Sequence, residues 1–194
     1  MASPDTEVFV HVRIVLGMVV SLGLARLLLG SARLVQHPGQ VKPYWVHLAW
    51  AFSLLLTLIH FWWWEFRLST IGTWHFTLYF FIIVYAALIF LLCALLFPDS
   101  MAEYSGYKEY FYSRRGWFFG VLAVSYLIDL FDTLVKGREY YASLGPVYPW
   151  HIGLGIVLSI TAGVTRSERF HAAFVIASIV YQIAFITGDY ATLR

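Results

Sequence analysis

The sequence predicts an all-α, polytopic membrane protein, with residues 1–194 forming a single transmembrane domain, a bundle of about six transmembrane helices. Composition is the first reason: 60% of the residues are hydrophobic, 19% aromatic and only 12% charged, and the mean hydropathy is +0.72. Soluble domains carry roughly 25% charged residues. The second reason is the presence of about six apolar runs near the ~20 residues that a helix needs to cross a hydrocarbon core of about 30 Å.

Short turn-forming segments separate the predicted spans, and Pro98 stops the third one. The segment that follows, residues 98–115, has Ser100 and Glu103 at capping-box spacing and aromatic residues at helical intervals. This pattern predicts a short interfacial helix between spans three and four. The predicted spans cover residues 7–36, 44–66, 74–97, 116–135, 150–165 and 170–188.

The stretch HFWWWEFRL, residues 60–68, places three consecutive tryptophans at the end of the second span. Indole rings prefer the headgroup level of a bilayer, because they combine an apolar body with one N–H donor. We therefore expect Trp62, Trp63 and Trp64 to mark the point where this helix leaves the membrane, and Arg67 to extend outward from it.

The distribution of basic residues predicts the orientation, because cytoplasmic loops are enriched in Lys and Arg. The loops after spans one, three and five hold seven such residues near the span ends, and the opposite side holds four. Both termini are therefore expected outside. Asp5 and Glu7 stand where a signal peptide would carry positive charge, so cleavage is not expected.

Polar residues of the fourth predicted span lie on one face of the helix. Such a stripe must face protein or water, because a charge exposed to lipid is costly. Its members are candidates either for structural pairing within the bundle or for lining a transport pathway: Ser125, Tyr126, Asp129, Asp132, Thr133 and Lys136.

Two arginines of the first span are candidates for the same polar core. Arg26 lies near mid-span and is the expected partner of Asp129 or Asp132, whereas Arg13 lies nearer the end of the span. The sequence thus predicts that Arg26 and the two aspartates form one buried electrostatic unit.

Two spans carry small residues at intervals of four, which allow close helix packing. One face comprises Arg13, Gly17, Ser21 and Ala25, and the other comprises His151, Gly155, Ser159 and Gly163. These faces predict tight packing within the chain or between subunits of a homo-oligomer.

Histidines suggest an alternative function as a b-type haem protein, with one haem between His47 or His60 and His151. The second helix required for a two-haem arrangement has no histidine at the matching spacing, so no cofactor is the primary expectation. No metal site is expected, and Cys93 has no cysteine partner. A net charge of +2, spread over helix ends, gives no indication of nucleic-acid binding.

The segments SLGLARLLLG, YWVHLAW and FWWWEF resemble the first two helices of a set of small, uncharacterised bacterial integral membrane proteins. The resemblance covers roughly the first third of the chain and implies a bacterial inner membrane, but no reaction, substrate or site residue. Motifs of hydrolases, phosphate-binding loops and zinc proteases are absent from the sequence. The sequence therefore favours a channel or a transporter of small solutes or ions over an enzyme, with a non-transporting scaffold or partner subunit as a further alternative.

Overall fold

The protein is described here by a computed structural model, which covers residues 4–71 and 73–189. In these ranges the chain forms seven α-helices and one 3₁₀ helix. Six of the α-helices are long and apolar enough to cross a membrane, the second of them together with the 3₁₀ helix that continues it. The elements are α1 (Pro4–Gln36), α2 (Trp45–Trp64), η1 (Glu65–Thr70), α3 (Phe76–Leu96), α4 (Tyr107–Val135), α5 (Arg138–Ser143), α6 (Val147–Val164) and α7 (Glu168–Asp189).

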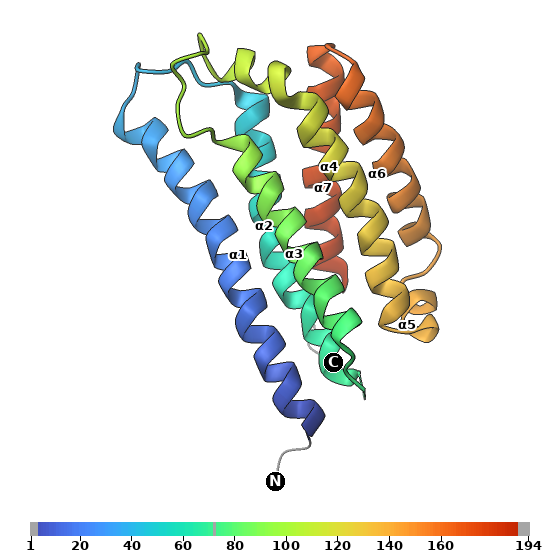
Figure 1. The fold of residues 1–194 in the computed structure, drawn as a ribbon. Coiled ribbons are helices and arrows are strands. Elements are labelled where there is room, and N and C mark those ends of the chain that lie inside the picture. Colours follow the sequence, from blue (N-terminus) through green and yellow to red (C-terminus); the bar gives the residue numbers. More distant parts are fainter. Residues whose placement is uncertain (1–3, 72, 190–194) are drawn as a thin grey trace.

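The predicted spans agree with the long helices except at the start of the fourth. The separate interfacial helix expected between spans three and four is wrong, since α4 is one continuous helix of 29 residues. A helix of this length extends about 43 Å, well beyond a hydrocarbon core of about 30 Å. Figure 1 shows that its first turns lie across one end of the bundle before the helix turns to run along α6.

Helix α4 also begins with a different cap from the expected one. Glu109 accepts hydrogen bonds from both the backbone N–H and the hydroxyl of Ser105, at 2.8 and 2.7 Å, and Gly106 precedes the first helical residue. Ser100 instead accepts a bond from the backbone N–H of Ala102 in a turn. Tyr107 is buried, and its N–H donates to the carbonyl oxygen of Lys42, so the start of α4 is held against the loop after α1.

The most extensive helix contacts are those of α4 with α6, α1 with α3, α3 with α4 and α2 with α7. In Figure 1 the N-terminal end of α1, the C-terminal end of α7, and α5 lie at the same end of the bundle, which we call the terminal end. The loops after α1, α3 and α6 lie at the other end, which we call the loop end. Each membrane-length helix runs from one of these ends to the other. The position of a residue along its helix therefore gives its depth in the bundle.

The small-residue face of α6 packs within the chain. A Cβ added at Gly155 would lie 2.7 Å from the ring of Tyr126 on α4, and Ser159 is fully buried. This face is therefore closed to a second subunit. On α1, Gly17 lies under the ring of Trp62, whereas Ser21 and Ala25 are exposed. Self-association of the protein stays a prediction. Of the two small-residue faces, the one on α1 remains accessible to a second subunit.

Candidate functional site: a polar cavity inside the bundle

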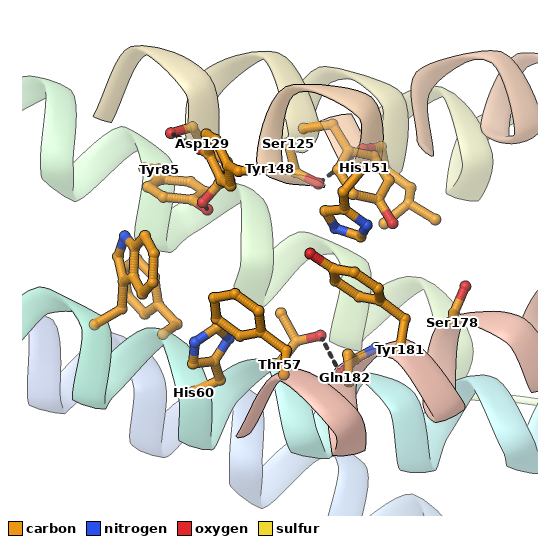
Figure 2. A pocket seen from close by; sticks show the side chains of 15 residues that line it. Thr57, His60, Tyr85, Ser125, Asp129, Tyr148, His151, Ser178, Tyr181 and Gln182 are labelled. Carbon is orange, nitrogen blue, oxygen red and sulfur yellow. Dashed lines mark hydrogen bonds between the residues drawn. The ribbon is translucent and has the colours of Figure 1, made fainter. Parts of the chain in front are cut away.

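A cavity of about 130 Å³ lies between α2, α3, α4, α6 and α7. Figure 2 shows side chains of these helices arranged around it, with Asp129, Tyr85 and Tyr148 on one side and His60, Thr57 and Gln182 facing them. Seven of its fifteen lining residues are aromatic (Phe, Tyr or Trp). The remaining members of the lining are Phe61, Trp64, Leu122, Ser125, Tyr126, His151, Ser178, Tyr181 and Phe185.

Asp129 is the carboxylate of the cavity wall, and two tyrosines hold it in place. Tyr85 donates a hydrogen bond of 2.9 Å to Oδ1, and Tyr148 donates one of 2.9 Å to Oδ2. The Thr133 hydroxyl lies 2.7 Å from that of Tyr148 and supports its orientation. Because an ionised carboxylate has about four lone-pair positions, two tyrosine donors leave acceptor capacity for another group.

The polar stripe of α4 faces the inside of the bundle, as its pattern predicts. Ser125, Tyr126 and Asp129 line the cavity, and Asp132 and Thr133 are fully buried one turn further toward the terminal end. The members of the stripe thus face either the cavity or packed protein. Whether these residues take part in transport stays a prediction.

Next to the cavity, toward the terminal end, lies a buried ionic cluster of Glu65, Lys136 and Asp132. The Lys136 ammonium group lies 2.9 Å from Oε1 of Glu65 and 2.5 Å from Oδ2 of Asp132. The side chain of Glu65 is 3% exposed, that of Lys136 is 1% exposed and that of Asp132 is 0% exposed. A buried charge requires a partner at this distance, because removal of an ion from water costs several kcal/mol.

The ionic cluster separates the cavity from a surface depression at the terminal end. The depression, about 540 Å³, is lined by Lys136 itself together with Arg67 and residues of the segment 137–143. On its other side, the Lys136 ammonium group lies 5.5 Å from the ring centroid of Trp64, which lines the cavity. Depression, ionic cluster and cavity thus follow one another in that order.

The predicted unit of Arg26 with Asp129 and Asp132 is wrong. Arg26 instead forms a 2.6 Å ion pair with Asp99 at the loop end. This partly exposed pair lowers the pKa of the Asp99 carboxyl below its ordinary value, through the hydrogen bond and charge of the guanidinium group. Arg13 lies over three aromatic rings, those of Phe9, Trp62 and Phe66, at 5.5 to 6.0 Å. Neither arginine therefore belongs to the polar core.

The interfacial position expected for the tryptophan triplet stays a prediction, and the structure distinguishes its members by burial. Trp62 and Trp63 are 38% and 43% exposed, whereas Trp64 is 6% exposed and turned toward the cavity. Glu65, which follows it, is the cluster member that sequence reasoning missed.

A periodic signal for Glu65 exists in the sequence. Buried side chains of this segment recur at intervals of three and four, and Glu65 occupies one of these positions among apolar residues: Leu54, Leu58, Phe61, Glu65 and Leu68. A glutamate in the register of a buried helix face requires a buried partner.

The structure does not bring the three candidate haem ligands to one site. His47 lies outside the cavity wall, 2.6 Å from the carbonyl oxygen of Leu96, and stacks on Tyr107. His60 and His151 do share the cavity, but the ring of His151 lies flat on Tyr181, with centroids 3.8 Å apart. Pockets for drug-sized ligands measure about 300 to 1,000 Å³, so a cavity of about 130 Å³ is too small for a haem.

The arrangement combines one ammonium group with three carboxyl groups in the interior of a largely apolar bundle. Such groups can accept and donate hydrogen bonds and can attract ions of opposite charge. The described residues include no group of three or more His, Cys, Asp or Glu side chains that could hold a metal ion. No protein-family model, curated protein or solved structure matches the chain.

Proposed function

We propose that the protein is a multi-pass membrane carrier for small solutes or ions and that the cavity around Asp129 is its binding site. The observation that supports this proposal is a cavity with polar groups in its wall, in the middle of a bundle of membrane-length helices. Polar and ionisable groups are costly inside a membrane, and they mark substrate or ion pathways in many membrane proteins. A scaffold needs no such cavity, since its buried polar groups can be satisfied by direct packing.

The closures at both ends of the cavity favour a carrier over an open channel. On the terminal side, the ionic cluster of Glu65, Lys136 and Asp132 lies between the cavity and the surface depression. On the loop side, the ring of Trp50 is 2% exposed and packs edge-on against three phenylalanines, with centroids 5.1 to 5.5 Å apart. These phenylalanines come from α4 and α7: Phe118, Phe119 and Phe174. Opening one closure at a time would give access to the cavity from one side of the membrane.

The membrane in this proposal is a bacterial inner membrane, which the resemblance of the first third of the chain implies. The charge distribution gives the orientation: we place the loop end in the cytoplasm and both termini outside, because the loop end carries more Lys and Arg. In this orientation the ionic cluster closes the cavity on the outer side. Cysteines introduced at Ser105 and Ser143 test it, since an impermeant thiol reagent added to intact cells should label only the second.

Flux into liposomes tests the carrier proposal directly. Purified protein is reconstituted and assayed with protons, sodium, potassium, tetramethylammonium and neutral polyols, the ions by charge movement on a solid-supported membrane and the polyols by light scattering. Ser178→Phe should abolish the flux, because Ser178 lines the cavity. Ile176→Phe is the matched control, since Ile176 lies on the same helix and is 51% exposed.

Two results would contradict the carrier proposal. The first is flux of every solute at the level of protein-free liposomes, which would favour the non-transporting scaffold. The second is equal flux through wild-type protein and a folded Ser178→Phe variant, because solute would then cross without using the cavity.

A further inference from the structure

We infer that the cavity selects small organic ammonium ions, with Asp129 as the counter-charge and the surrounding aromatic rings as the walls. This inference rests on the proposed function, for which it names the substrate class. Among the described residues, the cavity lining contains one carboxylate, seven aromatic residues (Phe, Tyr or Trp) and no Lys or Arg. An alkylammonium ion combines the two properties that such a lining complements, a positive charge and an apolar surface.

Charge balance in the bundle favours a cation over a neutral ligand. Asp132 and Glu65 share Lys136, and the ion pairs among the described residues include none for Asp129. Among the described residues, the hydrogen-bond donors to the Asp129 carboxylate are the neutral hydroxyl groups of Tyr85 and Tyr148. Three carboxyl groups thus face one ammonium group, and a bound cation would reduce the negative charge that is buried.

The aromatic lining favours an organic cation over a hydrated inorganic one. Rings from five helices contribute to the wall, among them Trp64, Tyr85 and Tyr126. Aromatic faces attract cations within about 6 Å of the ring centroid and are the common recognition elements for quaternary ammonium groups. Sodium and potassium prefer several oxygen ligands, whereas a methylated ammonium ion forms its contacts mainly through carbon.

Size limits the ligand to a few non-hydrogen atoms. An engineered apolar cavity of about 150 Å³ accommodates one benzene molecule, which has six carbon atoms. The cavity of about 130 Å³ is close to this size. Tetramethylammonium, with five non-hydrogen atoms, matches the volume, the charge and the apolar surface together.

Binding in detergent solution tests the inference without requiring transport. Purified wild-type protein is titrated with tetramethylammonium chloride and, separately, with tert-butanol, a neutral molecule of similar shape and the same number of non-hydrogen atoms. Affinity is measured by calorimetry and by the thermal shift, with sodium chloride as the salt control. We expect tetramethylammonium to bind at least about tenfold more tightly than tert-butanol, since a cation–aromatic attraction at a desolvated site adds to that of the carboxylate.

Variants then connect the selectivity to Asp129. Asp129→Asn should reduce tetramethylammonium affinity by at least about tenfold while leaving that for tert-butanol unchanged. Asp99→Asn is the control, because Asp99 is an exposed carboxylate at the loop end. If Asp129→Asn fails to fold, the comparison of the two ligands on wild-type protein still decides the question.

Equal affinity for the charged and the neutral ligand, or the absence of tetramethylammonium binding, would overturn the inference. These outcomes are distinguishable from failure of the carrier proposal. Selective binding without any flux would leave the ammonium site in place and remove the carrier. Flux of inorganic ions or polyols through the cavity, without ammonium binding, would leave the carrier and remove this substrate class.

Discussion

Replacement of Lys136 by methionine should strongly destabilise the protein, because it removes the ammonium group between two buried carboxyl groups. The ammonium lies 2.9 Å from Glu65 and 2.5 Å from Asp132, and all three side chains are at most 3% exposed. Methionine retains a similar length and an apolar stem, so the substitution removes the charge without opening a large cavity. The two carboxyl groups then face each other without a counter-ion.

The expected magnitude follows from this burial. Removal of one partner of a buried ion pair costs about 3 to 5 kcal/mol, whereas replacement of the whole set by neutral residues is often close to neutral. For a domain of about 150 to 250 residues, a change of 1 kcal/mol moves the Tm by about 2 to 4 °C. Lys136→Met should therefore lower the Tm by about 6 to 20 °C, and the triple variant with Glu65→Gln and Asp132→Asn should recover most of the loss.

The assay is thermal unfolding of purified protein in detergent, followed by tryptophan fluorescence, with membrane yield as a second measurement. Arg26→Met is the matched control. Its ion pair with Asp99 is partly exposed, and such pairs contribute little to stability, so this variant should keep nearly the wild-type Tm. Unfolding of Lys136→Met at the wild-type temperature, or a triple variant less stable than the single one, would contradict a role of Lys136 as the buried counter-ion of Glu65 and Asp132.

Three further predictions concern packing, the tryptophan triplet and the loop end. Gly155→Ala should lower the Tm and reduce ligand affinity, because the new Cβ would lie 2.7 Å from a cavity-lining ring. Gly163→Ala is the control and should change neither quantity, because its Cβ would have its nearest neighbour at 3.8 Å. Trp64→Phe should lower stability and affinity because this indole is buried, while the exposed Trp63→Phe should be nearly silent; equal effects would remove the distinction between them. In an NMR titration, the Asp99 carboxyl should show a pKa below 3.8, and its ion pair should be lost only as the pH falls through that lowered value.

The six long apolar helices, apart from the first turns of α4, and the buried face of α4 could be predicted from the sequence. Runs of about 20 apolar residues form membrane-length helices whatever surrounds them, since backbone groups in lipid must be satisfied within the helix. The polar stripe that ends in Asp132 and Lys136 was likewise predictable, because the helical period places its members on one face. These are local properties of the chain, and the structure agrees with them.

The predicted pairing of Arg26 with Asp129 and Asp132 is wrong because these residues lie at different depths along the bundle. Part of this information is present in the sequence. Arg26 lies ten residues, or about 15 Å, before the end of α1 at the loop end, whereas Asp132 lies three residues before the end of α4 at the terminal end. Because the two helices run in opposite directions, these side chains lie at different depths. Successive spans run in opposite directions, so the position of each residue within its span indicates its depth. The opposite charges of the residues alone do not indicate it.

Only the tertiary structure decided which side chains meet across the bundle. Trp64 and Glu65 follow two exposed tryptophans, yet they turn inward and complete the wall of the cavity and the ionic cluster. The cavity itself combines residues from five helices, with Tyr85 and Tyr148 reaching Asp129 from α3 and α6. Such contacts depend on the rotation and offset of each helix relative to its neighbours, and these are set by the packing of side chains far apart in the chain rather than by any local pattern.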